Sequence, residues 1–335
     1  MNRYDNREAW IDYAKVIGMF LIVWGHLFPP HVSKYIYSIN VPLFFFLSGY
    51  LFKDAPFKKL LSKNIRSLAI PYLAFAFLNV IIGMLFVGGG TTLHLGINSL
   101  NSRFLCSILG ILLGCHSIGD IDCAGALWFV YDLFLIKLLY HFTSKNNAVQ
   151  IISILIAFSA AIYVNTLDGP TTASPLVSAP IAYCFFALGR IIKEHPLPAF
   201  RYGWKAFLLI LALIAVYLAS ARGLGVAYLL VGKLGSSVFR FIPASLTGLL
   251  LFFTIVKALR LKNNYFITAS SCGTIVTLSV QGWLINIAYS FISDSSPFFV
   301  GTSFIASLLI MIVSFGIIVL INKFLPFLLG GRRFS

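Results

Sequence analysis

The sequence predicts an all-α, polytopic helical membrane protein with about ten transmembrane helices in one bundle. The 335 residues are 59% hydrophobic and only 10% charged, which is far more apolar than soluble domains are. Apolar runs of about 20 residues, the length needed to cross the hydrocarbon core, recur along the chain, and the alternation of a membrane β-barrel is absent. The net charge of +15 marks membrane topology and not nucleic-acid binding, because the basic residues cluster between apolar runs.

The spans belong to one integral-membrane domain over residues 1–335. The first run is too long, and too polar at its start, for a cleaved signal peptide, so it stays in the protein. Boundaries follow from the hydropathy of each run. The spans are expected at roughly 10–28, 35–52, 68–87, 125–143, 148–165, 177–193, 205–221, 240–258, 267–291 and 299–322.

Basic residues are distributed unequally between the two sets of loops. With the amino terminus inside, most loop lysines and arginines fall on the inner face, which predicts that both termini are cytoplasmic. The outer face carries only Lys34, Arg103, Arg222, Lys233 and Arg240. The outer loop 88–124 contains the apolar stretch FLCSILGILLGC, too short to cross, so a re-entrant or interfacial segment is expected there.

The cysteines match no metal-ligand spacing, and no metal site is predicted. Cys106, Cys115 and Cys123 lie in the outer loop, where an oxidising periplasm would allow two of them to form a disulfide. The stretch 224–239 is a second candidate for an element at the outer surface. No repeat relates the two halves of the chain, which disfavours a transporter.

The first span carries three ionisable residues, Asp12, Lys15 and His26. Lys15 and His26 are eleven residues apart, so on a helix they lie within about 20° of each other and about 16 Å apart along the axis. Ionisable groups in hydrocarbon need protein or water around them, so this stripe should face the bundle interior. Alternatively, Lys15 marks the membrane surface and His26 caps the far end of the helix.

Four motifs resemble the acyltransferase-3 family of bacterial membrane enzymes, especially the branch that O-acetylates cell-surface sugars. The first is Lys15 followed, after ten intervening residues, by His26. The second is INVPLFFFLSGYLF in span 2. The third is the basic pair in KNIRSLAIPY, and the last comprises ALWFVYDLF and APIAYCFFALGRIIK. Many members of this branch have a histidine where this chain has Asn40, and another near Gln281. Both replacements can form hydrogen bonds but cannot titrate.

The resemblance implies an inner-membrane enzyme that transfers an acetyl group from acetyl-CoA to a sugar hydroxyl. His26 would be the general base or would carry the acyl group covalently, with Lys15 and Asp12 as the other catalytic candidates. Lys63 and Arg66, three residues apart on one helix side, would bind the phosphates of coenzyme A. Without the motif, ordinary positive-inside charge would explain this pair.

Five residues are candidates for binding the acceptor. Asp132 would orient the imidazole or bind a sugar hydroxyl, and a lone acid hydrogen-bonded to neighbouring helices is the alternative. For Trp128 the choice is between stacking on a sugar and anchoring at the interface. Ser48 belongs to this set, although close helix packing also explains a Ser-Gly pair. The full set is Asn40, Ser48, Trp128, Asp132 and Gln281.

The expected partners are acetyl-CoA, a sugar or polysaccharide acceptor and the lipid bilayer; no bound cofactor and no nucleic acid are expected. The acceptor is a surface polysaccharide or its lipid-linked precursor, and a homo-oligomer is compatible with the sequence. Two alternatives stay open. One is a polysaccharide or lipid-intermediate transporter, which would not require the Lys15 and His26 pair, and the other is transfer of a different acyl group such as succinyl.

Overall fold

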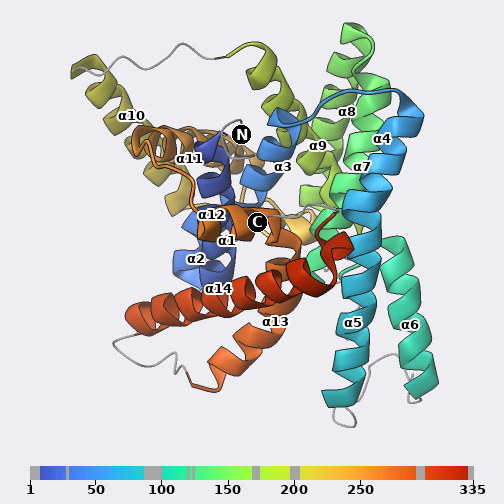
Figure 1. The fold of residues 1–335 in the computed structure, drawn as a ribbon. Coiled ribbons are helices and arrows are strands. Elements are labelled where there is room, and N and C mark those ends of the chain that lie inside the picture. Colours follow the sequence, from blue (N-terminus) through green and yellow to red (C-terminus); the bar gives the residue numbers. More distant parts are fainter. Residues whose placement is uncertain are drawn as a thin grey trace, which may run out of the picture.

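The computed structural model describes residues 8–27, 30–86, 100–118, 121–122, 125–167, 174–196, 204–291 and 299–330. Apart from two short strands, the regular structure of these residues is helical (Figure 1). The α-helices are α1 (Ala9–Leu27), α2 (Pro30–Tyr37), α3 (Asn40–Tyr50), α4 (Phe57–Asn64), α5 (Ile70–Phe86), α6 (Leu100–Leu113), α7 (Trp128–Thr143), α8 (Asn147–Thr166), α9 (Pro175–Glu194), α10 (Trp204–Arg222), α11 (Val238–Ala258), α12 (Tyr265–Cys272), α13 (Thr274–Tyr289) and α14 (Phe299–Phe324).

Shorter elements lie between these helices. A π-helical turn, η1 (Ile65–Ala69), joins α4 to α5. Strands β1 (Ser117–Ile118) and β2 (Ile121–Asp122) pair antiparallel. Three 3₁₀ turns complete the set: η2 (Gly125–Leu127), η3 (Leu229–Val231) and η4 (Pro326–Leu329).

The all-α membrane fold is confirmed. Each span expected from hydropathy coincides with a helix or a pair of helices. In the described residues, six helices are long and apolar enough to cross a membrane, and a seventh span results if α12 and α13 are counted together. The count of about ten therefore stays a prediction.

Three spans differ in detail from their predictions. The second is divided into α2 and α3 at residues 38–39, and the ninth bends by 81° between α12 and α13. The bend lies at Gly273, where an added Cβ would come within 2.5 Å of the Ile318 side chain on α14. The helix of the third span begins earlier than expected, at Phe57, because lysine and arginine are good helix formers and extend the helix beyond its apolar part.

Helix α1 lies between two hydrophobic cores. It packs against α3 and α11 on one side and against α12, α13 and α14 on the other. Ala14 belongs to the first core, whereas Met19 and Val23 belong to the second. The stripe that carries Lys15 and His26 is thus on the helix that joins the two halves of the core.

Helices α3 and α9 form the closest crossing in the first core. A Cβ on Gly49 would overlap the carbonyl oxygen of Phe186, and a Cβ on Gly189 would overlap that of Phe46. The two glycines therefore let the two backbones touch, as small residues do in membrane helix pairs. This crossing agrees with close packing as the reason for the Ser48-Gly49 pair.

The apolar stretch expected within the outer loop 88–124 forms α6, which has 14 residues and lies beside α5 (Figure 1). Cys115 is buried and is not disulfide-bonded, so a disulfide among the outer-loop cysteines would not include it. Cys123 lies outside the described residues.

Candidate active site

The imidazole of His26 is exposed at the end of α1. Its Nδ1 is 2.9 Å from the hydroxyl of Tyr37 on α2, and the two rings meet edge to face with centroids 5.8 Å apart. The Tyr289 hydroxyl on α13 donates to the main-chain carbonyl of His26. That carbonyl is among the last four of the helix, which lack a partner within it, so Tyr289 ties α13 to this end of α1.

Two of the tyrosines around His26 expose a large part of their surface. Tyr228, in the segment before η3, lies with its ring centroid 5.9 Å from that of Tyr37. Tyr228 is 50% exposed and Tyr289 is 43% exposed. Three separate elements therefore bring a tyrosine to this end of α1, and of the three the Tyr37 ring contacts the imidazole. A ring face combined with a hydroxyl suits a ligand that is apolar on one side and polar on the other.

The rest of the α1 stripe runs into the protein. Met19 and Ile22 are buried, and Lys15 is half-buried. This burial matches the expectation that the stripe faces the bundle interior. Lys15 and His26 stay roughly 16 Å apart along the helix, so the structure places them on one face without bringing them into contact.

Asp12 is buried and binds residues at both ends of α12. Its Oδ1 accepts a hydrogen bond from the Ser271 hydroxyl at 2.5 Å, and its Oδ2 accepts one from the Asn263 amide at 3.1 Å. His26 lies fourteen positions after Asp12 on the helix, a rise of about 21 Å. Asp12 therefore joins α1 to α12 and lies far along the helix from the His26 imidazole.

Lys63 and Arg66 are both exposed. Within the described part of the chain neither forms an ion pair, so both cations are available to a ligand. Arg66 lies in the π-helical turn η1, a type of irregularity that is frequent at functional sites. No described interaction links this pair to the α1 stripe.

Three of the predicted acceptor contacts are buried polar side chains. Asn40 is 1%, Asp132 0% and Gln281 2% exposed. The Asn40 Nδ2, both Asp132 carboxylate oxygens and the Gln281 Oε1 find no hydrogen-bond partner among the described residues. Buried polar atoms are normally paired, so each of these atoms is a candidate contact for a ligand or water.

The other two acceptor candidates are placed differently. Trp128 is 8% exposed and packs edge to face on Phe129, so most of its ring is covered by protein. Ser48 is half-buried beside the Gly49 crossing. The elements that carry the acceptor candidates are neighbours: α1 packs on α3 and α13, and η2 contacts both α13 and α7. No described hydrogen bond joins the predicted acceptor residues to one another.

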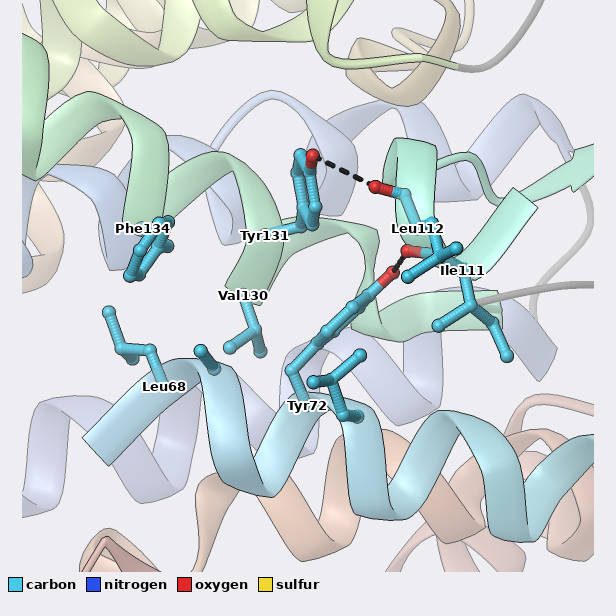
Figure 2. Close-up of a pocket in the computed structure, with 9 residues that line it drawn as sticks. Leu68, Tyr72, Ile111, Leu112, Val130, Tyr131 and Phe134 are labelled. Atoms are coloured by element: carbon cyan, nitrogen blue, oxygen red, sulfur yellow. Dashed lines mark hydrogen bonds between the residues drawn. The ribbon is translucent and has the colours of Figure 1, made fainter. Parts of the chain in front are cut away.

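A separate pocket of about 120 Å³ lies where α5, α6 and α7 meet (Figure 2). The Tyr72 hydroxyl donates to the Ile111 carbonyl at 2.7 Å, and that of Tyr131 donates to the Leu112 carbonyl at 3.1 Å. Both carbonyls lie in the last turn of α6, and that of Ile111 also accepts from the Gly114 N–H. The remaining lining is apolar, so this pocket offers no group for acid–base chemistry.

The fold and the exposed histidine site define a multi-pass helical membrane protein with a site at one end of its central helix. The family model described as an acyltransferase domain, that of the acyltransferase-3 family, matches residues 8–323, nearly the whole chain. The chain therefore belongs to the acyltransferase-3 family and is a membrane acyltransferase. Comparison with curated proteins and with solved structures finds no match for this chain.

Sequence reasoning found His26 but missed the tyrosines around it. Tyr37 follows His26 by eleven residues, whereas Tyr228 and Tyr289 follow it by more than 200. Aromatic residues are frequent at membrane interfaces, so none of the three carried a signal of its own. Their gathering at His26 depends on how α2, α13 and the segment before η3 pack.

Proposed function

We propose that this membrane acyltransferase moves an acetyl group from acetyl-CoA to a sugar hydroxyl of a bacterial surface polysaccharide or of its lipid-linked precursor. The observation that carries the proposal is the exposed His26 imidazole, which is hydrogen-bonded to Tyr37 at one end of the α1 stripe, where Tyr228 and Tyr289 also lie. It places a group that can accept a proton where a polar ligand can approach from outside the helices.

The donor would bind at the opposite end of the protein. Lys63 and Arg66 are exposed cations without ion-pair partners in the described part of the chain, and a guanidinium matches phosphate oxygens in a bidentate manner. The predicted topology puts them on the cytoplasmic face of a bacterial inner membrane, where acetyl-CoA is available. Lys15, half-buried between this face and His26, would contact the pantetheine arm.

The acceptor would bind at the His26 end. Tyr228 and Tyr289 offer exposed rings, and Asn40, Asp132 and Gln281 offer buried polar atoms without a described partner. As the sugar oxygen attacks the thioester carbonyl carbon, a C–O bond forms and the C–S bond breaks. His26 takes the hydroxyl proton and passes it to the leaving sulfur, or else carries the acetyl group between the two substrates.

The test replaces His26 with Gln in cells that lack the chromosomal gene, followed by NMR of the surface glycan. Glutamine can form a hydrogen bond but cannot accept the proton, so the rate of acetyl transfer should fall at least about 100-fold. His195→Gln, the same change at an exposed histidine after α9, is the matched control.

Three other results would contradict the proposal. Normal O-acetylation by the His26→Gln protein would leave the histidine with a structural role only. Loss of the whole polymer with the gene would favour a transporter. If the glycan lost a succinyl group and not an acetyl group, the donor would be succinyl-CoA and not acetyl-CoA.

A further inference from the structure

Helix α2 is held firmly beside the His26 end of α1. The Tyr217 hydroxyl on α10 donates to the Tyr35 carbonyl at 2.6 Å, and the Lys34 ammonium donates to the Arg222 carbonyl at 2.8 Å. Gly25 permits the approach, since a Cβ there would lie 3.1 Å from Ile36. Tyr37, the last residue of α2, is therefore presented to His26 by a fixed backbone.

The contact between Tyr37 and His26 restricts the chemistry of the imidazole. In the described part of the chain, Nδ1 is the ring nitrogen with a hydrogen-bond partner, the Tyr37 hydroxyl at 2.9 Å. A neutral imidazole has one N–H donor and one acceptor nitrogen. If Tyr37 donates to Nδ1, the hydrogen of the ring is on Nε2, and Nε2 then has no lone pair with which to take a proton. If Nδ1–H donates to the Tyr37 oxygen, Nε2 keeps its lone pair.

We propose that Tyr37 is a positioning residue that accepts a hydrogen bond from Nδ1–H of His26 and so holds Nε2 as the proton-accepting or acyl-accepting atom. The inference rests on the proposed function, because it assigns a task to the same histidine. The partner of a catalytic imidazole commonly sets its tautomer and orientation. Here a phenol oxygen has that role, and Tyr37 acts only through the imidazole.

The direct test reads the tautomer and needs no acceptor. The full-length protein is labelled with ¹⁵N-histidine and studied by NMR in lipid bilayers at a pH where His26 is neutral. The chain has six histidines, so the signal lost in His26→Gln identifies His26. The expected spectrum has Nδ1 protonated and Nε2 unprotonated. A protonated Nε2 in the unaltered protein would overturn the inference.

Removal of the Tyr37 hydroxyl tests whether it sets the His26 tautomer. Tyr37→Phe keeps the ring and should shift the His26 population toward the Nε2–H tautomer, whereas Tyr228→Phe should leave the tautomer unchanged because no described bond joins Tyr228 to the imidazole. An unchanged tautomer in Tyr37→Phe would mean that another group sets it and would refute the assignment.

Transfer of radiolabelled acetyl from acetyl-CoA to a nitrophenyl glycoside separates this inference from the proposed function. Tyr37→Phe should lower kcat at least about tenfold, the order expected when a base is held in the wrong tautomer, with an unchanged KM for acetyl-CoA. Adding Tyr37→Phe to His26→Gln should cause no further loss, because the hydroxyl acts through the imidazole. A normal rate for His26→Gln refutes the function, whereas normal kcat for Tyr37→Phe alone refutes only the role of Tyr37.

Discussion

The crossing of α3 and α9 provides a sharp stability test, because a single methyl group has no room there. In Gly49→Ala the new Cβ would overlap the Phe186 carbonyl oxygen and would lie 2.7 Å from the carbonyl carbon. Ordinary van der Waals contact for a Cβ begins at 3.4 Å. The two backbones must therefore separate by more than 0.7 Å, the difference between 3.4 and 2.7 Å for the carbonyl carbon, because the carbonyl oxygen is closer still. Both partners are helix backbone, so no side-chain rotation can relieve the overlap.

The expected cost follows from two opposing terms. Alanine is favoured over glycine inside a helix by about 0.5–1 kcal/mol. Overpacking a core costs about 1–3 kcal/mol, and the upper end applies because Phe45, Phe46 and Phe186 are all buried around the crossing. Overpacking prevails, and Gly49→Ala should lower the free energy of unfolding by about 2 kcal/mol.

Thermal unfolding of the purified protein in detergent, followed with a thiol-reactive dye, measures this cost. Gly316→Ala on α14 is the matched control, since a Cβ there meets nothing within 4 Å; it should be neutral or raise the unfolding temperature. Gly189→Ala, on the other side of the crossing, should destabilise like Gly49→Ala. If Gly49→Ala unfolds at the same temperature as the Gly316→Ala control, the close crossing is wrong.

Two further predictions concern the donor face and the orientation. Arg66→Ala should weaken acetyl-CoA binding, measured by calorimetry, by about 1.5–3 kcal/mol, as for a lost charge-assisted hydrogen bond. Arg66→Lys should recover only part of the binding free energy because the planar guanidinium is lost. Lys58→Ala, a change at an exposed residue of the same continuous helical segment, should bind acetyl-CoA normally. Unchanged affinity in Arg66→Ala would mean that Arg66 only marks the cytoplasmic side of the membrane. Reporter fusions at 58, 145, 198 and 262 should report the cytoplasm and those at 95, 170 and 295 the outside, whereas a cytoplasmic signal from 95 would reverse the orientation and the donor path.

Hydropathy and helical periodicity determined which segments are helical and which face of α1 carries Lys15 and His26. Both are local properties: a run of apolar residues is read within about 20 positions, and Lys15 and His26 share a stripe because they belong to one helix. Burial of Met19 and Ile22 on the same stripe agrees with that reading. The close crossing at Gly49 was also visible as a Ser-Gly pair, although its partner on α9 was not.

Only the tertiary structure decided which groups meet these residues. Asn263 binds Asp12 across 251 positions, and Tyr289 binds the His26 carbonyl across 263. Contacts at such separations depend on how the helices pack, which residue spacing does not encode. The bend at Gly273 likewise lies where the Ile318 side chain of α14 leaves no room for a Cβ. Because the partner of the His26 Nδ1 lies on another helix, the sequence identified the histidine, and only the packing of α2 on α1 assigned Tyr37 to it.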